Sequence, residues 1–291
     1  MTTTDPARRP RRSVLYMPAA NERALQKAKT IPCDAIIFDL EDAVAPDAKP
    51  AARHLAVAAV TGGEYGAREL TIRCNALTTP WGPDDLAAAA AAGPAAVVIP
   101  KVDSVDDLDE IAARLDDGGG QSTSIWAMVE TPKAIFDVRA IAGHPRVTVL
   151  VVGTNDLARE LRAPLGVAHR ANLVPHLATA VLGAREAGKV ILDGVYNDVG
   201  DADGFVSECR QGVELGFDGK TLIHPGQVDA ANQAWSPSAD EIDAARRVIA
   251  AYAEAEADGR GVITVDGRMV EALHVENARR TLAVADAIAA I

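Results

Sequence analysis

Carboxylates follow two of the apolar runs in this chain, each at the point where the run ends. Glu130 comes directly after Ile125–Val129, and Asp156 closes the Gly153–Asp156 segment that follows Val147–Val152. Two carboxylates that share a point with waters and substrate oxygens suit Mg²⁺, a hard ion that usually keeps several waters. Mn²⁺ is the alternative ion. The pair is therefore our candidate metal site.

Polar residues also end the other apolar runs. At any one of these positions a carboxylate is more often a helix cap than a catalyst, and Asp42 and Asp193 are both open to that interpretation. Thr154 or Asn155 is expected to cap the helix after the sixth run, which leaves Asp156 in its first turn. The residues that end the other runs are Asp39, Glu41 and Asp42, then Arg73 and Asn75, then Lys101, and finally Asp193 and His224.

Other kinds of site fit the sequence less well. Lys101 is the strand-end lysine that a Schiff-base aldolase would need, but Pro100 and Asp103 beside it give no sign of the apolar pocket that lowers a lysine pKa. No histidine and cysteine cluster has zinc spacing, and no Gly-x-Ser-x-Gly motif supports a serine hydrolase. His224 is as well suited to packing or capping as to catalysis. These chemistries are therefore disfavoured.

The polar residues need a scaffold that brings many strand ends together. Eight short runs alternate with Ala-rich stretches, and most are continuously apolar, which is typical of strands buried on both faces of a parallel sheet. Eight strand–helix repeats favour a closed (β/α)₈ TIM barrel over an open doubly wound sheet. No Gly-x-Gly-x-x-Gly follows any run, which counts against a dinucleotide fold. The predicted strands are Val14–Met17, Ala35–Leu40, Leu70–Arg73, Ala96–Pro100, Ile125–Val129, Val147–Val152, Val190–Leu192 and Lys220–Ile223.

The pattern changes after the eighth run. Ser238 and Glu241 have the spacing of a capping box, which opens a helix. Asp266-Gly267 is a dipeptide favoured in tight hairpins. These signals predict a helix–hairpin–helix appendage on the barrel. Its elements are a helix from Ser238 to about Asp258, a hairpin over Gly261–Val270 and a helix from about Glu271 to Ala289.

Three segments follow from these patterns. Residues 1–11 are predicted to form a disordered basic tail. Residues 12–235 are predicted to form the barrel, which carries the catalytic site. Residues 236–291 are too few for an independent domain, so we expect this extension to pack on the barrel or on a neighbouring subunit.

The totals limit the class of protein. The 291 residues are 48% hydrophobic and 24% charged, which fits one barrel of about 250 residues with an appendage. A formal charge of −12 argues against a nucleic-acid partner. No run is long enough to span a membrane, and the Arg-rich start lacks a secretory signal. Three widely spaced cysteines fit neither a disulfide framework nor a thiolate metal site. We expect a cytoplasmic protein with no membrane partner.

Short blocks of sequence stand at the predicted strand ends, in order along nearly the whole chain. They resemble the citrate lyase β-subunit-like CoA ester lyases of the HpcH/HpaI aldolase superfamily, and the Asp-Leu-Glu-Asp-Ala-Val stretch is quite specific. The blocks are Arg12-Ser-Val-Leu-Tyr-Met-Pro18, Asn21-Glu-Arg-Ala-Leu25, Phe38-Asp-Leu-Glu-Asp-Ala-Val-Ala-Pro-Asp-Ala-Lys49, Ile72-Arg-Cys-Asn75, Thr79-Pro-Trp-Gly82, Val98-Ile-Pro-Lys101, Val129-Glu-Thr-Pro132, Gly153-Thr-Asn-Asp-Leu157 and Ile223-His-Pro225.

The resemblance implies roles for the strand-end residues. It implies that Glu130 and Asp156 hold Mg²⁺, in agreement with the argument from the strand ends. It implies that Arg73 binds a carbonyl oxygen or the enolate that develops from it. It also implies that Glu41 and Asp42 support the reaction, either through waters on the metal or through contacts to Arg73.

The resemblance also implies a CoA thioester as substrate. CoA would enter along the N-terminal basic stretch, with Arg12 and Lys27 as contacts to its phosphates. Asn75, which follows Arg73, is counted with the substrate-binding residues. Members of the family commonly assemble as trimers or dimers of trimers, so a homotrimer or hexamer is expected, with the C-terminal appendage reaching a neighbour's site.

Two positions depart from the family pattern. Ala19 stands where many relatives have Gly in a Met-Pro-Gly segment, so the first loop is expected to approach the ligand differently. Glu271 stands where relatives often carry Asp in a Met-Val-Asp segment, and it is the candidate acid/base. Glutamate keeps the carboxylate but extends it by one methylene. A shift of about 1 Å can cost on the order of a hundredfold in rate, so this change either retunes the substrate or spoils the geometry.

The implied reaction is a Mg²⁺-dependent carbon–carbon cleavage. A malyl-CoA, citramalyl-CoA or citryl-CoA would give an acyl-CoA and a small 2-oxo acid. A malyl-CoA thioesterase is one alternative, because water can replace the carbon acceptor. A CoA-independent 2-oxo acid aldolase is another, although such enzymes usually have a histidine where this chain has Asp39-Leu-Glu-Asp42. A non-catalytic ligand-binding or complex subunit is the alternative from a different class, and the set of Arg73, Glu130 and Asp156 argues against it.

Overall fold

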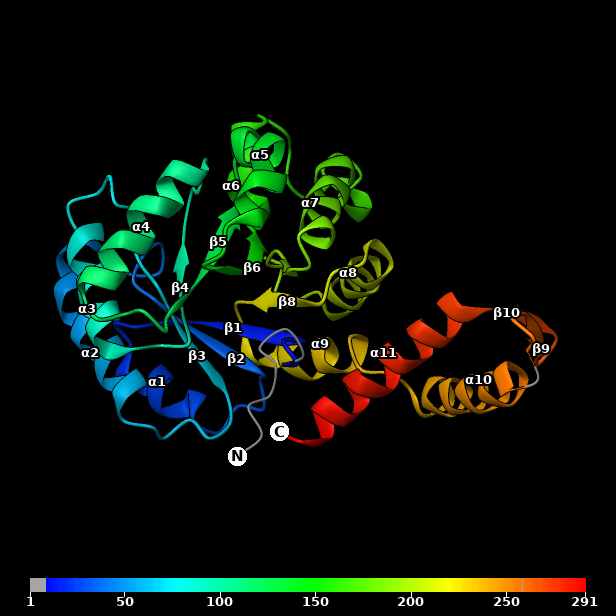
Figure 1. Ribbon diagram of the computed structural model, residues 1–291. Coiled ribbons are helices and arrows are strands. Elements are labelled where there is room, and N and C mark those ends of the chain that lie inside the picture. The colour runs from blue at the N-terminus through cyan, green and yellow to red at the C-terminus, as the bar shows by residue number, and fades with distance from the viewer. Residues whose placement is uncertain (1–8, 258) are drawn as a thin grey trace. The chain divides into compact units, whose positions relative to one another are not determined.

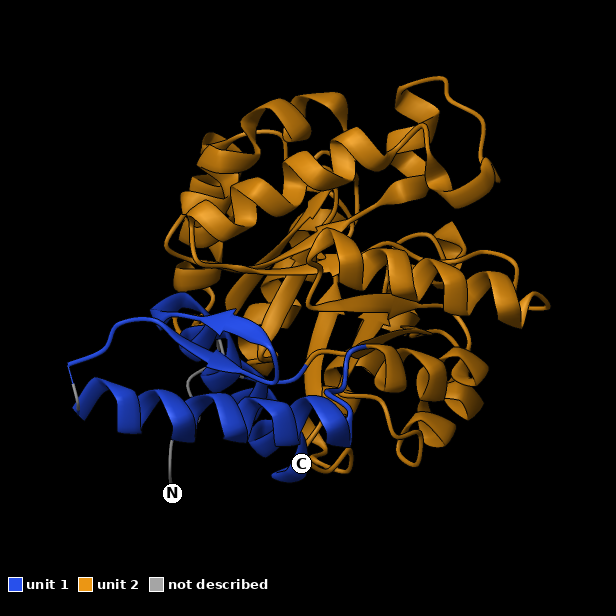
Figure 2. Ribbon diagram, turned by 90° about the vertical axis from the view of Figure 1, so that its right-hand side faces the viewer, with its two compact units in different colours: residues 1–10, 235–291 blue, residues 11–234 orange. Residues whose placement is uncertain are grey.

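Two compact units make up the chain. The computed structural model describes residues 9–257 and 259–291. We call Arg11–Ala234 the barrel unit, and Trp235–Ile291 with Arg9 and Pro10 the C-terminal unit; they are orange and blue in Figure 2. Most of the predicted basic tail, residues 1–8, lies outside the described residues.

Eight parallel strands close into a barrel in the barrel unit. Each strand pairs with the next along the chain, and β8 pairs with β1 to close the ring. All eight predicted strands are present, and the strands and their covering helices are seen in Figure 1. The TIM-barrel prediction is therefore confirmed. The strands are β1 Ser13–Pro18, β2 Ala35–Asp39, β3 Glu69–Arg73, β4 Ala96–Ile99, β5 Ser124–Val129, β6 Val147–Val152, β7 Val190–Asp193 and β8 Gly219–Leu222.

Helices follow the strands and cover the outside of the barrel. Several begin at a side chain that accepts a backbone N–H, as Asn21, Ser104, Thr131 and Asp201 do. Short 3₁₀ turns lie at Pro46–Ala48, Ala168–Arg170 and Pro225–Gln227. The helices are α1 Glu22–Ala28, α2 Lys49–Thr61, α3 Gly82–Ala92, α4 Val105–Asp117, α5 Pro132–Gly143, α6 Thr154–Glu160, α7 Val174–Glu186, α8 Ala202–Leu215 and α9 Val228–Ala234.

Side chains fill the barrel interior. Val14, Ile37, Val98, Trp126 and Val151 belong to one cluster in which each is fully buried. Small and large residues thus fill the space between the strands, and the interior is a packed core rather than a pore. The polar groups that follow the strands stand above this core at its carboxyl end.

A buried ion pair closes the opposite, amino-terminal end of the barrel. Arg11, which we assigned to the disordered tail, is 3% exposed. Its guanidinium donates to both carboxylate oxygens of Glu69 at the start of β3, at 2.6 and 2.9 Å, and lies 5.5 Å from the centre of the Trp126 ring. The tail prediction is therefore wrong at Arg11, because a bidentate partner and an aromatic face hold this residue in the fold.

A second buried charge network joins the end of β7 and the start of β8 to α8. Lys220 Nζ lies 2.9 Å from Asp193 and 2.8 Å from Glu208, and Arg170 lies 2.7 Å from Asp193. Asp193 and Lys220 are fully buried. Burial raises the pKa of Asp193, but Lys220 and Arg170 lower it more, so the net pKa lies below its usual value. Asp193 thus forms an ion pair and does not cap a helix.

Replacing Asp193 by asparagine is expected to lower the free energy of unfolding at pH 7 by about 3–5 kcal/mol, because it leaves buried cations without their partner. The Asp193 contribution is complete above the ordinary pKa near 4 and is lost as the pH falls through the lowered folded-state pKa. The difference between wild type and Asp193→Asn in urea unfolding should therefore narrow below about pH 4. Asp243→Asn, in an exposed pair with Arg246, should cost about 0–1 kcal/mol. Equal effects of the two substitutions would contradict the structural role.

The C-terminal unit has the predicted helix–hairpin–helix order. Ser238 Oγ accepts from the Glu241 N–H while Glu241 Oε2 accepts from the Ser238 N–H, which is a capping box. Asp266 and Gly267 have φ values of 49° and 77°, as a tight hairpin turn requires. The elements are α10 Ala239–Ala257, β9 Ile263–Val265, β10 Arg268–Val270 and α11 Ala272–Ala289.

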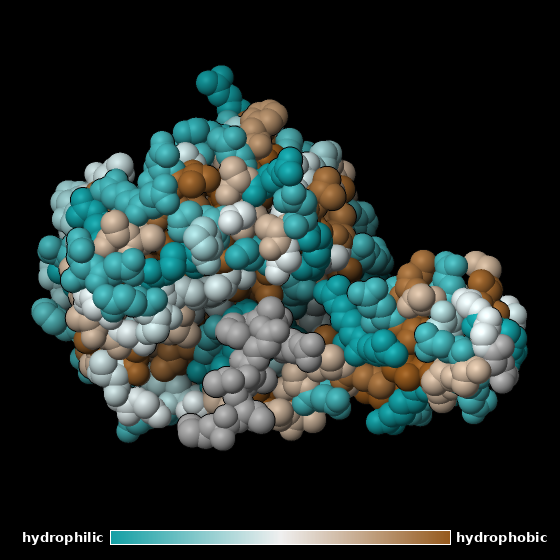
Figure 3. Space-filling view, in the orientation of Figure 1, coloured by the Kyte–Doolittle hydropathy of each residue, from teal (hydrophilic) through white to brown (hydrophobic). Residues whose placement is uncertain are grey.

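Several large hydrophobic side chains of the C-terminal unit are exposed. Val262, Met269, Leu273 and Ile291 are each more than half exposed, and hydrophobic patches are visible on the surface in Figure 3.

Among the described residues, none of the helices is both long and apolar enough to span a membrane.

Candidate active site at the carboxyl end of the barrel

A cavity of about 380 Å³ opens at the carboxyl ends of the barrel strands. Its walls come from residues that end or follow strands, as the (β/α)₈ architecture requires of an active site. Arg73 from β3, Glu130 after β5 and Asp156 after β6 all line it. The three residues therefore share a cavity, and their roles stay predictions. Further lining residues are Tyr16, Asp39, Asp42 and Thr221.

Arg73 forms the positively charged wall of the cavity. Its Nε and Nη2 atoms donate to the two oxygens of Asp39 at 2.6 and 2.7 Å, and Nη1 lies 2.8 Å from Glu41. The ring of Tyr16 lies 4.7 Å from the guanidinium carbon. Burial lowers the pKa of Arg73, but its neighbours, Asp39 among them, raise it more, to well above its usual value. Arg73 is thus a fixed cation held at a defined angle.

Glu130, which follows β5, forms another part of the cavity wall and is 2% exposed. Its Oε1 accepts from the backbone N–H of Lys101 at 2.8 Å. Lys101 has a φ of 52°, a backbone conformation that costs a non-glycine residue about 1–2 kcal/mol. Burial, followed by the charges of Glu41 and Asp156, raises the pKa of Glu130 to about 8. Without a nearby cation, this carboxylate is difficult to ionise.

Asp156 lies in the first turn of α6, as predicted, but the cap is different. Gly153 occupies the N-cap position and no side chain caps the helix, so the prediction of Thr154 or Asn155 as the cap is wrong. The Asp156 carboxylate contacts Arg159 and lies 3.9 Å from Lys101 Nζ. A carboxylate in the first turn of a helix interacts favourably with the helix dipole.

Glu41 and Asp42 lie in the loop after β2, at different depths. Glu41 is ion-paired with Arg73, and burial raises its pKa to about 7. The Asp42 side chain is 72% exposed and lies 3.6 Å from Arg73. Contacts of both residues to Arg73, which the resemblance implied, are therefore present in the structure, and the contact of Glu41 is the shorter one.

A buried lysine, Lys49, also holds the loop after β2. Lys49 Nζ donates to the backbone carbonyls of Leu40 and Glu41 at 2.8 and 2.7 Å and to Asn75 Oδ1 at 2.9 Å. Asn75 in turn donates to Leu40 O and to Asp85. Asn75 therefore uses its amide inside the fold and does not line the cavity. The structure thus gives Asn75 a role in holding the loop, and its role in substrate binding stays a prediction.

The two predicted phosphate contacts lie away from the cavity. Arg12 precedes β1, so it lies at the amino-terminal end of the barrel, where it pairs with Asp34 at 2.7 Å. Lys27 is exposed in the last turn of α1, which leads away from the carboxyl end of β1. The prediction of Arg12 as a CoA contact is corrected by this position. Neither residue lines the cavity of the barrel unit.

Two further predicted residues have structural partners. His224 Nδ1 accepts from the Gly226 N–H at 3.1 Å and so caps the short turn after β8. Glu271 belongs to the C-terminal unit and takes the N-cap position of α11, where its backbone N–H donates to His274 Nδ1 at 3.2 Å. The role of Glu271 as acid/base stays a prediction.

The sequence reasoning missed the residues that hold Arg73 and the loop after β2. Asp39 had been noted at a strand end but given no role, although it is the bidentate partner of Arg73. Asp39 also accepts from the backbone N–H groups of Glu41 and Ala43. The sequence did contain a signal for Asp39 and Lys49, because both belong to the family-like block Phe38–Lys49. Tyr16, whose ring lies against the guanidinium, belongs to the block Arg12–Pro18 and so had the same signal.

The site suits a metal that takes few protein ligands. Within the described part of the chain, no group of three or more His, Cys, Asp or Glu side chains is placed to hold a metal ion. Glu130 and Asp156 both line the cavity, and Glu41 adds a third negative charge that acts on Glu130. Magnesium commonly uses one or two carboxylates and completes its shell with water and substrate. The donors present therefore fit Mg²⁺.

Gly153 allows Glu130 to occupy its place. A Cβ atom added at Gly153 would lie 2.3 Å from Glu130 Oε2 and 2.6 Å from Glu130 Cβ. Because the φ of Gly153 is −95°, alanine is acceptable to the backbone, and the conflict is with the Glu130 side chain. Gly153→Ala is expected to lower kcat about a hundredfold, since a 1 Å shift can have that effect. Gly143→Ala, which meets nothing within 4 Å, is the control. Equal kcat values would contradict this role of Gly153.

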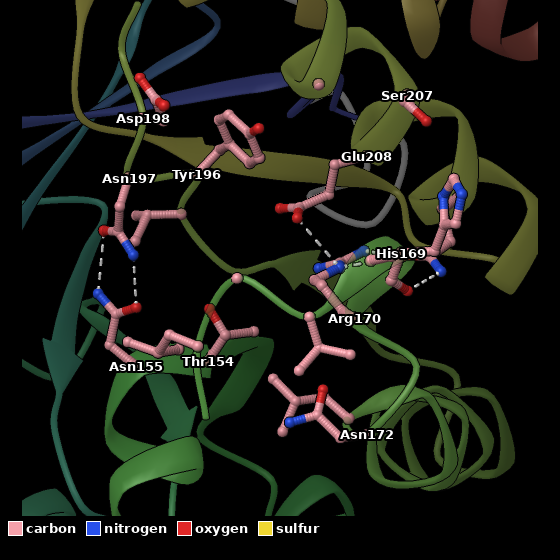
Figure 4. Close-up of a pocket in the computed structure, with 18 of the residues that line it drawn as sticks. Thr154, Asn155, His169, Arg170, Asn172, Tyr196, Asn197, Asp198, Ser207 and Glu208 are labelled. Atoms are coloured by element: carbon pink, nitrogen blue, oxygen red, sulfur yellow. Dashed lines mark hydrogen bonds and ion pairs between the residues drawn. The ribbon is translucent and has the colours of Figure 1, made fainter. Parts of the chain in front are cut away.

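A second cavity, of about 600 Å³, adjoins the first. Thr154, Asn155, Val195 and Asn197 line both. Its other walls come from the segment before α7 and from α8, and Figure 4 shows Arg170, Glu208 and Asn172 around it. The second cavity therefore lies beside β6 and β7, and Asn155 and Asn197 line it as well as the first cavity.

Comparisons with known sequences identify the family of the chain. A profile of the HpcH/HpaI aldolase/citrate lyase family matches residues 12–225. The chain is 48% identical over 281 residues to a (3S)-malyl-CoA thioesterase of Cereibacter sphaeroides, a match that covers 97% of this chain and 96% of that one. It is 35% identical over 288 residues to the citrate lyase subunit beta of Escherichia coli, with 96% and 94% covered.

A solved structure shows the same likeness in three dimensions. The protein CitE from Mycobacterium tuberculosis, in complex with magnesium, acetoacetate and coenzyme A, superimposes with a TM-score of 0.80 at 29% identity. That match covers 96% of this chain and 99% of the other. This chain therefore belongs to the HpcH/HpaI aldolase/citrate lyase family.

Proposed function

We propose that this chain is a Mg²⁺-dependent enzyme of (3S)-malyl-CoA, and that its principal reaction is hydrolysis of the thioester. One observation carries the proposal: a single cavity has the Arg73 cation on one wall and the Glu130 and Asp156 carboxylates on another. The 48% identity to a (3S)-malyl-CoA thioesterase supports hydrolysis over cleavage. Hydrolysis was the alternative in our sequence analysis, and cleavage is now the second candidate.

Glu130 and Asp156 would hold the Mg²⁺ ion. A bound Mg²⁺ supplies positive charge that binds and polarises substrate oxygens. Malyl-CoA offers a carboxylate and a hydroxyl on one carbon, a pair of oxygens suited to such an ion. Magnesium in the structure of CitE supports the choice of ion. The protein residues thus orient the malyl group by its carboxylate end.

Arg73 would bind the thioester carbonyl oxygen. Its guanidinium is held by Asp39 and Glu41 before the substrate arrives, so little reorganisation is needed when negative charge develops on that oxygen. Preorganised charge of this kind is commonly the largest catalytic contribution. Arg73 would therefore offset the negative charge on the thioester oxygen in hydrolysis and in cleavage alike.

A carboxylate near the cavity would accept the proton of the attacking water. The water oxygen bonds to the thioester carbon, the carbon–sulfur bond breaks, and the proton passes to the CoA sulfur; the products are malate and CoA. Glu41, with a pKa of about 7, has the value that favours a general base near neutral pH. The acid/base role of Glu271, in the C-terminal unit, stays a prediction.

Carbon–carbon cleavage is the second candidate, supported by the 35% identity to citrate lyase subunit beta. Here a base takes the hydroxyl proton, the bond between the hydroxyl-bearing carbon and the next carbon breaks, and the enolate is protonated. The products are glyoxylate and acetyl-CoA. Arg73 serves both reactions in the same way, because each reaction places negative charge on the thioester oxygen.

Product analysis separates the two reactions. The protein is incubated with (3S)-malyl-CoA and Mg²⁺, free thiol is followed with a thiol reagent, and glyoxylate is followed as its hydrazone. We expect free thiol and malate, with little glyoxylate. Glyoxylate and acetyl-CoA without free thiol would establish cleavage instead. The absence of all of these products would contradict both reactions and favour a ligand-binding subunit.

A homotrimer or hexamer and a cytoplasmic location stay predictions. A CoA-independent 2-oxo acid aldolase is disfavoured, because Asp39, Glu41 and Asp42 occupy the loop where such enzymes usually have a histidine.

A further inference from the structure

Two asparagine side chains stand between the catalytic cavity and the second cavity. Asn155 Nδ2 donates to Asn197 Oδ1 at 3.1 Å, and Asn197 Nδ2 donates to Asn155 Oδ1 at 2.7 Å. Figure 4 shows the two amides facing each other, joined by both hydrogen bonds. Both residues line both cavities. The pair is therefore a shared wall.

The backbone on each side of the pair is held in place. Asn155 lies in the first turn of α6, directly before Asp156. On the other side, Gln227 Nε2 donates to the Tyr196 carbonyl at 3.1 Å, and the Tyr196 hydroxyl donates to Asp201 at 2.6 Å. Asn197 follows Tyr196 directly. The two amides thus meet because both segments are fixed, and the wall does not depend on the pair alone.

The space behind this wall suits an alkyl group. Leu165, Val167 and Leu173 line the second cavity, together with Val195 at the wall. Its volume of about 600 Å³ exceeds the 380 Å³ of the catalytic cavity. An unbranched chain of several carbons would fit within it and contact apolar side chains.

The position of the Asn155–Asn197 pair determines which part of the substrate lies next to it. β3, which carries Arg73, and β7, which leads to Asn197, lie four strands apart in the ring of eight and so face each other. On the proposed function, Arg73 takes the thioester oxygen and Asp156, beside Asn155, helps to hold the carboxylate and hydroxyl. The remaining substituent on the hydroxyl-bearing carbon then points away from Arg73, towards the asparagine pair.

We propose that the Asn155–Asn197 pair determines substrate specificity by limiting that substituent to hydrogen or methyl. Breaking the pair opens the second cavity to longer alkyl groups. This proposal rests on the proposed function, since it takes the malyl group as the occupant of the catalytic cavity. It assigns no role in the bond-breaking step to either asparagine.

The test measures binding, so it does not depend on turnover. Glyoxylate, pyruvate, 2-oxobutanoate and 2-oxopentanoate are titrated by calorimetry into the full-length protein with Mg²⁺. The wild type should bind 2-oxopentanoate far more weakly than pyruvate. In Asn197→Ala and in Asn155→Ala, the Kd of 2-oxopentanoate divided by the Kd of pyruvate should fall at least tenfold. Gln121→Ala removes an exposed amide that precedes β5 at the amino-terminal end, and its ratio should match that of the wild type.

Failure of this inference differs from failure of the proposed function. Unchanged Kd ratios in both asparagine variants overturn the specificity role, even if malyl-CoA is turned over. A changed ratio in a protein that leaves malyl-CoA intact supports the wall and overturns the proposed reaction. If the wild type binds no 2-oxo acid with Mg²⁺, the specificity role is overturned as well.

Discussion

Glu130→Ala is expected to lower turnover of malyl-CoA by about a thousandfold or more. Losing one of two carboxylates weakens the hold on Mg²⁺, and a bound metal contributes several kcal/mol to transition-state stabilisation. About 4 kcal/mol corresponds to a thousandfold, since each 1.36 kcal/mol is tenfold. The measurement is kcat at saturating substrate and at a Mg²⁺ concentration that just saturates the wild type. Glu160→Ala, in an exposed position at the end of α6, should retain wild-type turnover.

Measurements of the free energy of unfolding distinguish loss of the metal site from loss of the fold. The pKa of Glu130 is raised to about 8, above its unfolded value near 4.3. With EDTA present, the folded wild type therefore loses stability relative to Glu130→Gln as the pH rises from about 4 to about 8. At pH 8 the glutamine variant should be inactive and more stable than the wild type without metal. Turnover in Glu130→Ala close to that of the wild type would remove Glu130 from the site.

Arg73→Met is expected to lower kcat by about 10²–10³, the usual effect of removing one preorganised donor to a developing oxyanion. It also leaves Asp39 buried without its bidentate partner, which costs roughly 3–5 kcal/mol of stability. Arg73→Lys should recover only part of the activity, because an ammonium lacks the planar fork that meets both Asp39 oxygens. The measurements are kcat, KM and urea unfolding for each variant.

Arg185→Met is the matched control for Arg73→Met. Arg185 is also ion-paired, with Asp218, and donates to the Lys189 and Gly216 carbonyls at the amino-terminal end of the barrel. Its loss should reduce stability and leave kcat of the folded protein unchanged. If both arginine variants lost stability and kept kcat, Arg73 would be a structural residue and the oxyanion role would be wrong.

The fold was readable from the sequence because its signals are local. Runs such as Ile125–Val129 and Val147–Val152 are apolar at every position, which is the pattern of strands covered on both faces. Ser238 and Glu241 cap the helix that their spacing predicts, and Asp266-Gly267 makes the predicted turn. These features depend on neighbours close in sequence. The structure therefore contains the elements that these local signals predict.

The site was only partly readable, because side-chain partners come from distant segments. The ends of parallel strands meet at one rim, which is why Arg73, Glu130 and Asp156 were found together. Nothing close to Asn75 in sequence shows that its amide meets Lys49. Arg12 precedes the first strand, so the barrel topology places it at the end opposite to the cavity, where it pairs with Asp34.

Direct metal titration tests the central claim, that Glu130 and Asp156 hold a divalent ion at the barrel mouth. Mn²⁺, whose free form gives an electron paramagnetic resonance signal, replaces Mg²⁺ in the titration of metal-free protein. One bound ion per chain is expected in the wild type, displaced by excess Mg²⁺, with affinity lowered at least a hundredfold in both Glu130→Ala and Asp156→Ala. Equal Mn²⁺ binding by the wild type and both folded variants would contradict the claim.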